Sequence, residues 1–371
     1  MELLLVRAPL LGDDLEVALL ALGADIRRLE PTDIGLDLLG AAKNDGVAGL
    51  LSVNHSPQVA LLCSVAGLPY VSWTIDPVPR KRWEILGGTD LSKTTLFVHR
   101  KALVEPLRSM GYREVHWMPL ACAERRWSDP VDGRRGDRGS LFVGSSLLDE
   151  RKIFVDSMAR WGIGHAQEGI DAALQGIAKA CLWDRSFQGF LRDLSAVPTS
   201  LAKALPAVDR QDLAEALDAG LAWHFRRELV AILCSAGVEV KGDGGWEEFA
   251  GRNWTGPLRN GREMTQAYAT ASVNLDVPRL HQREIATLRA FDVLGSGGLL
   301  ACEAGTELDE LFVPGEHFLS WSGEQDLRAI LEASKGRDPS LDRIAAAGRR
   351  AVIASHSMDN RAARIVKAFG A

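Results

Sequence analysis

The sequence predicts an α/β protein made of two doubly wound domains, and three observations lead to this fold class. Short apolar runs alternate with helical patterns along most of the chain, and a stretch rich in glycine and arginine interrupts the alternation after residue 121. The 371 residues also exceed what one core of ordinary size needs. Because strands that alternate with helices form parallel sheets covered on both faces, we expect one Rossmann-like sheet on each side of that stretch.

The first domain is expected over residues 1–121. Its predicted strands are the apolar runs at 3–6, 25–29, 46–53, 70–73, 95–99 and 114–118. Pro119 ends the last strand, since proline has no N–H to give to a sheet. Residues 122–139 lack periodicity and are interpreted as a linker. We expect their basic run, Arg134-Arg135 with Arg138, to be solvated.

The second domain is expected over residues 140–354. Its predicted strands lie at 140–143, 238–241, 272–275 and 299–301. Residues 151–236 show only helical patterns, which is longer than one crossover needs, so we interpret them as a helical insertion. Residues 355–371 are predicted to form a terminal helix that packs back on the first domain.

Composition excludes several classes of protein. The formal net charge of −6 gives no general attraction for nucleic acid. No segment reaches the roughly 20 apolar residues that span a bilayer. The 5 cysteines include no C-x-x-C pair, which is typical of reduced thiols. We therefore expect a cytoplasmic protein with no nucleic-acid partner and no membrane span.

The strongest chemical signal is a predicted helix that starts at Glu284. Asp292 lies eight residues later, so the two carboxylates are expected on one side of the helix. The N-terminus of such a helix attracts a diphosphate, and His281, Arg283 and Arg289 can add donors or charge. The alternative is that Arg289 and Asp292 form a surface pair. This pattern predicts a nucleotide-sugar site, with the sugar near Glu284 and the ribose near Asp292.

Two glycine-containing turns follow predicted strands of the same domain. Gly144-Ser145 is expected to approach the phosphates, although no G-x-G-x-x-G or P-loop pattern is present. The loop with Asp243 and Gly244 lies at the carboxyl end of another strand, where open α/β sheets bind ligands. Trp246 is predicted to face the nucleobase, with burial in the core as the alternative.

The first domain supplies two candidates for a catalytic base. Asp76 follows a strand and precedes Pro77, so its side chain is expected to project toward the acceptor, unless it only caps the strand end. His99 ends another strand and is the alternative base, or else a structural histidine. No H-x-x-x-H, cysteine pair or D-x-D is present, so we expect neither a metal nor a cofactor beyond the nucleotide-sugar co-substrate.

The chain from Val238 to its end resembles the C-terminal half of CgeB-like glycosyltransferases, whose wider relatives carry Glu, seven residues, then Glu. Glu284 and Asp292 occupy these two places, and Asp292 departs from the pattern. Ser72–Pro77 is similar to the Trp-x-x-Asp-Pro region of the associated N-terminal domain. Further matching segments are 273–275, 307–312, 315–316, 344–348, His356 and Arg361.

This resemblance implies a GT-B fold and a metal-independent glycosyltransferase of hexosyltransferase type. The donor would be a nucleoside diphosphate sugar, with UDP favoured, and the outcome retention of configuration. The acceptor is a protein, a glycan or a small molecule. Two alternatives stay open: a non-catalytic maturation protein that binds a nucleotide-sugar or glycan, which the shorter Asp292 favours, and a nucleotide-sugar epimerase of the same fold.

Overall fold

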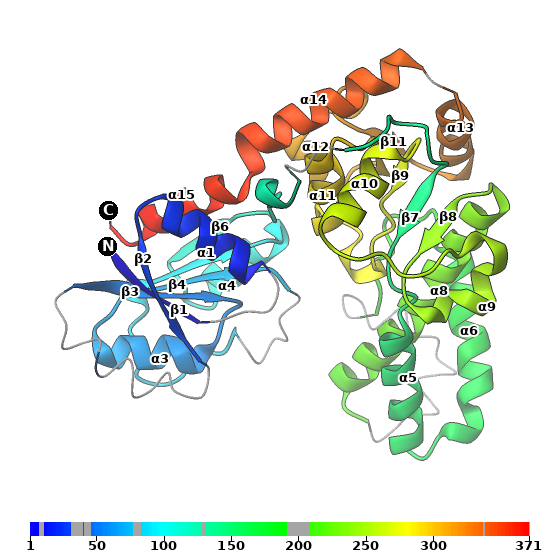
Figure 1. Cartoon of the computed structure of the whole chain (residues 1–371). Helices are drawn as coiled ribbons and strands as arrows, with labels where there is room; N and C mark the ends of the chain where they lie inside the picture. Colours follow the sequence, from blue (N-terminus) through cyan, green and yellow to red (C-terminus); the bar gives the residue numbers. More distant parts are fainter. Residues whose placement is uncertain are drawn as a thin grey trace. The chain divides into compact units, whose positions relative to one another are not determined.

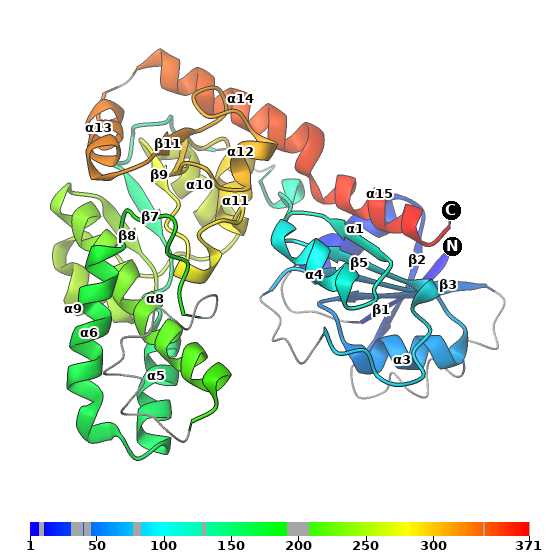
Figure 2. The same ribbon diagram turned by 180° about the vertical axis from the view of Figure 1, so that it is seen from behind.

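The computed structural model shows two compact units, each of which contains one parallel sheet (Figures 1 and 2). Unit 1 comprises residues 1–125 and 351–371, and unit 2 comprises residues 126–350. The structure describes residues 1–6, 11–30, 40, 46–76, 83–127, 131–190, 208–336 and 338–370.

Unit 1 contains a parallel sheet of six strands in the order β2-β1-β3-β4-β5-β6. The strands are β1 (Glu2–Val6), β2 (Asp25–Leu29), β3 (Val47–Val53), β4 (Tyr70–Thr74), β5 (Thr94–Val98) and β6 (Glu114–Trp117). Its helices are α1 (Gly12–Ala21), α3 (Pro57–Ala66), α4 (Val104–Ser109) and α15 (Met358–Ala368). Helix α3 covers one face of the sheet, and α1 with α15 covers the other (Figures 1 and 2).

Helix α3 illustrates how local sequence sets the ends of an element. Ser56 caps its start, because its Oγ accepts from the N–H of Val59, and Pro57 takes the first helical position, where no N–H is needed. Gly67 ends the helix with a φ of 71°, which glycine adopts without strain. The buried face of α3 then packs on the side chains of β1, β3 and β4.

Unit 2 contains a parallel sheet of five strands in the order β11-β10-β9-β7-β8. The strands are β7 (Leu141–Val143), β8 (Glu239–Lys241), β9 (Asn274–Leu275), β10 (Leu300–Glu303) and β11 (Leu319–Trp321). Beyond the long helices described below, it has α9 (Glu247–Ala250), α10 (Arg262–Thr270), α11 (Leu288–Ser296), α12 (Leu308–Leu311) and α13 (Glu324–Ser334).

The two sheets share one order of connection. In each, the second strand lies on one side of the first strand and the third strand lies on the other, so the chain changes direction between β1 and β3 and between β7 and β9. Open α/β sheets bind their ligands at such switch points, outside the carboxyl ends of the strands. The prediction of two doubly wound sheets is confirmed.

In the described part of the chain between β7 and β8 lie three long helices: α5 (Leu148–Arg160), α6 (Gln167–Ala180) and α8 (Arg210–Ser235). Asp209 caps α8 by accepting from the N–H groups of Gln211 and Asp212. Helix α8 packs along both α5 and α6, and in Figures 1 and 2 α5 and α6 extend away from the sheet of unit 2. Within the described part of this stretch, the predicted helical insertion is therefore confirmed.

The segment predicted to be a solvated linker is partly built into unit 2. Only 8% of Arg135 is exposed; its Nε lies 2.5 Å from Oδ1 of Asp342, and its Nη1 donates to the carbonyl of Ser272. The expectation of a solvated basic run is wrong for Arg135, since partners far along the chain satisfy its charge and its donors.

The division between the units falls within α14 (Pro339–His356), and α15 follows it in unit 1. Ser357 and Asn360 form a capping box at the start of α15. The buried Arg361 donates to the carbonyls of Pro119 and Leu120. Among the described residues, no helix is both long and apolar enough to cross a bilayer.

Candidate functional site

The turn after β7 brings the backbone close to an arginine of α11. A Cβ on Gly144 would lie 2.7 Å from Cζ of Phe142 and 3.1 Å from Nη2 of Arg289. Any other residue would push these side chains away, so the missing side chain is what allows the approach. The structure thus brings together Gly144 and Arg289, both of which the sequence singled out.

Asp276 follows β9 and fixes the start of α11. It is buried; its Oδ1 accepts from Nη1 of Arg289 at 2.6 Å, and its Oδ2 accepts from Oγ1 of Thr287 at 2.6 Å. Thr287 is also the N-cap, since its Oγ1 accepts from the N–H of Ala290. The sequence analysis missed Asp276, although its place directly after a predicted strand was a usable signal.

Arg226 of α8 joins the two sides of the switch point. Only 3% of it is exposed; its Nη1 donates to the carbonyl of Ser145 at 3.1 Å and its Nη2 to the carbonyl of Val277 at 3.0 Å. Its Nε is buried and has no hydrogen-bond partner among the described residues. Burial, then the nearby Arg289, lower the pKa of Arg226 to about 9, so the group still carries its charge at neutral pH.

Three arginines near this switch point form a cationic site, which we call the arginine cluster: Arg226, Arg279 and Arg289. Nη1 of Arg279 lies 2.7 Å from Oε1 of Glu150, and Arg289 pairs with Asp276. Three guanidinium groups therefore face two carboxylates, which leaves an excess of one positive charge in a chain whose net charge is −6. With the N-terminus of α11 beside it, this place favours an anion.

Asp243 joins two loops. Its Oδ2 accepts from the N–H of Ser146 at 2.8 Å, and its Oδ1 accepts from Oγ of Ser146 at 2.5 Å and from the N–H of Gly245 at 2.9 Å. Burial acts to raise the pKa of Asp243, but the hydrogen bonds from Ser146 and Gly245 hold it below its usual value. Its oxygens are thus committed to the loops after β7 and β8, and Gly244 beside it is exposed.

This loop requires two glycines that the sequence analysis did not select: Gly242, where a Cβ would lie 2.1 Å from the carbonyl oxygen of Gly144, and Gly245. A Cβ there would lie 2.2 Å from Oγ of Ser146, so the close packing of the two loops needs glycine.

Trp246 is a core residue, and the prediction that it faces a nucleobase is wrong. It is fully buried, its Nε1 donates to the carbonyl of Gly144 at 2.8 Å, and its ring meets Phe142 edge to face at 6.1 Å. The ring also contacts Phe249 at 5.8 Å, so the indole ring and its N–H are both used within unit 2. The alternative interpretation from the sequence, burial in the core, is the one observed.

The predicted start of the acidic helix is also wrong. Helix α11 begins at Leu288, and Glu284 lies in a turn before it, with its carbonyl accepting from the N–H of Glu307. Asp292 is half-buried inside α11, where its charge acts on Tyr268 of α10. The two carboxylates therefore do not project from one side of a single helix, because the cap at Thr287 starts the helix late.

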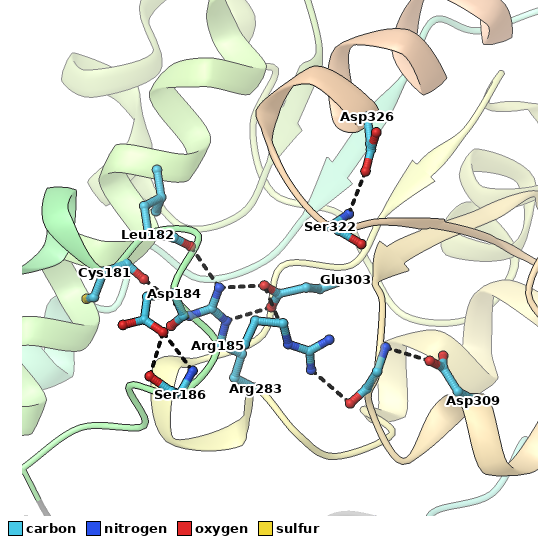
Figure 3. A network of polar contacts seen from close by, with 11 residues as sticks. Cys181, Leu182, Asp184, Arg185, Ser186, Arg283, Glu303, Asp309, Ser322 and Asp326 are labelled. Atoms are coloured by element: carbon cyan, nitrogen blue, oxygen red, sulfur yellow. Dashed lines mark hydrogen bonds and ion pairs between the residues drawn. The ribbon is translucent and has the colours of Figure 1, made fainter.

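Arg283 does not have donors left for a diphosphate, contrary to its prediction. It is buried, and it donates to both carboxylate oxygens of Glu303, at 2.6 and 2.5 Å (Figure 3). Its other hydrogen bonds go to the carbonyls of Cys181, Leu182 and Asp184. All five N–H donors of the guanidinium are thus used within unit 2. His281 lies half-buried in the short helix Leu280–Gln282, and its role stays a prediction.

In unit 1, Asp76 is exposed beyond the carboxyl end of β4, on a turn that Asn54 holds. Nδ2 of Asn54 donates to Oδ2 of Asp76 at 2.8 Å, and its Oδ1 accepts from the N–H groups of Ile75 and Asp76. Asn54 follows β3 with a φ of 67°, a conformation that asparagine tolerates better than most residues. Asn54, at the end of the neighbouring strand β3, therefore orients the carboxylate of Asp76.

His99 is buried at the carboxyl end of β5. Its Nδ1 lies 3.0 Å from the carbonyl oxygen of Thr74, and its Nε2 is buried without a hydrogen-bond partner in the described part of the chain. Burial, then the charge of Arg100, lower the pKa of His99 to about 4. The imidazole is therefore neutral at pH 7, and its second nitrogen is available to a polar partner.

Comparison with solved structures identifies this architecture. A glycosyltransferase from Rickettsia africae matches 99% of this chain and 97% of its own, with a TM-score of 0.51 and 9% identity. Anabaena HepE in complex with UDP and glucose gives a TM-score of 0.52 over 100% and 99% of the two chains, at 8% identity. Sucrose-phosphate synthase from Thermosynechococcus elongatus gives 0.54 over 100% and 98%, at 10% identity.

The chain has the GT-B fold. Residues 210–367, from α8 to α15, also match the family model described as glycosyl transferase-like, and they include all three arginines of the cluster. A search of curated protein sequences gave no match.

Proposed function

We propose that the chain is a glycosyltransferase that binds a nucleoside diphosphate sugar at the carboxyl edge of the unit 2 sheet. The observation that carries this proposal is Arg226. A buried guanidinium that donates only to carbonyls in the described structure, with an unpartnered Nε and two more arginines beside it, needs an anion to complete its surroundings.

A diphosphate has the right charge and shape for this place. Arg289 uses Nη1 on Asp276 and turns Nη2 toward the turn at Gly144, so the open side of its fork faces the switch point. During transfer, negative charge grows on the departing diphosphate, and fixed cations with the N-terminus of α11 stabilise it. We therefore propose a metal-independent reaction in which Arg226, Arg279 and Arg289 supply the positive charge.

For the remaining roles we keep the assignments that the sequence predicts. We assign Glu284 to the sugar of the donor and Asp292 to its ribose. We assign Asp76 to the acceptor hydroxyl as base or orienting acid, with the neutral His99 as the alternative base. UDP is the first nucleotide to test, because HepE was solved with UDP. We further propose a CgeB-like, cytoplasmic hexosyltransferase that retains configuration.

Thermal unfolding in the presence of nucleotides tests the proposal. UDP or GDP should raise the melting temperature at millimolar concentration, because a ligand that binds only the folded state stabilises it. If neither nucleotide does so, the donor assignment is wrong.

Transfer from a labelled UDP-sugar then separates the enzyme from its rivals. Product formation that is lost in Glu284→Ala supports the transferase. Binding without turnover would indicate a non-catalytic protein, which the absence of a same-side acid pair favours. Interconversion of the sugar without an acceptor would indicate an epimerase.

A further inference from the structure

The hydrogen-bond network around Glu303 ties the helical insertion to the sheet of unit 2 (Figure 3). The segment that follows α6 presents the carbonyls of Cys181, Leu182 and Asp184 to Arg283, which also forms the paired contact with Glu303 at the end of β10. Because both members of this ion pair are buried and every guanidinium donor is used, the segment is held firmly at the carboxyl edge.

Arg185 belongs to that segment and reaches the loop after β10. Its Nη2 donates to the carbonyl of Gly305 at 2.9 Å, and its Nε lies 3.9 Å from Oε1 of Glu303. Gly305 has a φ of 71°, and a Cβ there would lie 2.7 Å from Nη1 of Arg185, so glycine keeps the place for the guanidinium open.

Arg185 and Arg283 approach the same carboxylate but differ in how many of their N–H donors remain unused. Arg283 is buried with all donors used, whereas the side chain of Arg185 is 29% exposed and makes one hydrogen bond to the described residues. The guanidinium of Arg185 therefore keeps several N–H groups for a ligand. Its fork suits a pair of hydroxyls, a carboxylate or a phosphate.

The position of Arg185 relative to the arginine cluster indicates which part of a nucleotide-sugar Arg185 would contact. Glu303 ends β10, the neighbour of β9 on the side away from β7, about 4.8 Å along the sheet edge. A cavity of about 10 Å³ is lined by Asp276, which holds Arg289, and by Arg283 and Glu303, which lie beside Arg185, so the supports of the two sites adjoin.

The groups around Arg185 are polar, since it lies between the carbonyl of Gly305 and the carboxylate of Glu303. The carbonyl of Glu284 is bonded to the N–H of Glu307 in the loop that also carries Gly305. Carboxylates and guanidinium N–H groups match sugar hydroxyls, which both donate and accept.

We infer that Arg185 contacts the sugar of the donor, and that Arg283 and Glu303 are positioning residues that hold it there. The inference rests on the proposed function and deepens it: the helical insertion, through one arginine, helps to select the sugar. A diphosphate held by the arginine cluster at β7 and β9 places the group attached to it beside β10.

The test compares nucleotides with and without the sugar by calorimetric titration. In Arg185→Ala, the Kd for UDP-glucose should rise at least tenfold while the Kd for UDP stays within about twofold. GDP-mannose and GDP form a second pair. Arg185→Lys keeps the charge and loses the fork of the guanidinium. It should raise the Kd for UDP-glucose by less than the alanine variant does, again without changing the Kd for UDP, and it replaces the alanine variant if that variant does not fold.

Arg328→Ala is the matched control, since among the described residues Arg328 forms only an exposed pair with Glu324 on α13 and a bond to Ser235. Equal weakening of UDP and UDP-glucose in Arg185→Ala, or no change in either, would overturn the inference. If the wild-type chain binds neither nucleotide pair, the proposed function fails as well, and the two failures are thereby distinguished.

Discussion

The carboxyl edges of the two sheets have the same topology and opposite chemistry. At the edge of unit 1, His55 and His99 are buried and neutral, and Asp76 is exposed. At the edge of unit 2, Arg226 is buried and charged, with Arg279 and Arg289 beside it. The first edge suits proton transfer or hydroxyl binding, and the second suits a phosphate anion.

This difference shows that connection order decides where a ligand binds, and side chains decide which ligand. Both sheets change direction beside their first strand. Among the described residues, which leave out 7–10 and 77–82 of unit 1, only the unit 2 switch point combines a glycine turn, a helix N-terminus and uncompensated arginine charge. Four perturbations test whether this division of roles holds.

Acid should destabilise unit 1 more than unit 2. Burial lowers the pKa of His55 and of His99 from 6.5 to about 4. Well above pH 6.5 neither the folded nor the unfolded state binds a proton at these groups. The two histidines then make their full contribution to the free energy of unfolding. Between pH 6.5 and 4 only the unfolded chain gains protons, so the free energy of unfolding falls by about 3 kcal/mol for each histidine.

The measurement is urea unfolding followed from pH 7.5 to 4. His99→Asn should flatten the pH dependence, and His165→Asn, at an exposed position in unit 2, should not. An unchanged slope in His99→Asn would contradict the assignment of a neutral, buried imidazole.

Arg283→Met should lower the free energy of unfolding by about 3–5 kcal/mol, because it leaves the buried Glu303 carboxylate without its hydrogen-bonded partner and three carbonyls without a donor. Denaturant titration measures the effect, with Arg328→Met as a surface control expected within about 0.5 kcal/mol of wild type. A loss near that of the control would show that Arg283 has no structural role and could return to the diphosphate.

Arg289→Ala should reduce kcat/KM, because the transition state loses about 2–4 kcal/mol of stabilisation. This is the typical effect of removing one preorganised donor to a developing charge. Steady-state kinetics with a UDP-sugar measure it, and the affinity for UDP should fall with it. If turnover is retained while only stability changes, Arg289 serves Asp276 alone.

Asp76→Asn should lower kcat about tenfold and leave the Kd for UDP unchanged, since Asp76 lies in unit 1 and the arginine cluster in unit 2. Asn54→Ala should change kcat in the same direction by less, because it loosens the carboxylate without removing it. A wild-type rate in Asp76→Asn would remove Asp76 from the mechanism.

Periodicity was enough to predict the two sheets and the helical insertion, since both depend on which residues are apolar. It also selected Gly144 and Arg289, because a glycine after a strand and an arginine near a helix start are local signals. The roles of Arg283 and Trp246 could not be predicted, since both depend on partners distant in the sequence, Cys181 to Asp184 and Gly144.

One further residue, Arg226, and the start of α11 were missed for similar physical reasons. Arg226 lies in the middle of a helix, where nothing in the sequence distinguishes it from a solvated arginine. The late start of α11 depends on the bond between Thr287 and Asp276, and helical spacing extended that helix back to Glu284. Contacts between distant segments override local pattern at both places.

A structure of the chain with UDP tests the central claim most directly. The account predicts that the diphosphate lies between the turn at Gly144 and the N-terminus of α11, with oxygens within hydrogen-bonding distance, about 3 Å, of Arg289 and of at least one other arginine of the cluster. A nucleotide bound elsewhere, or no bound nucleotide at millimolar UDP, would contradict it.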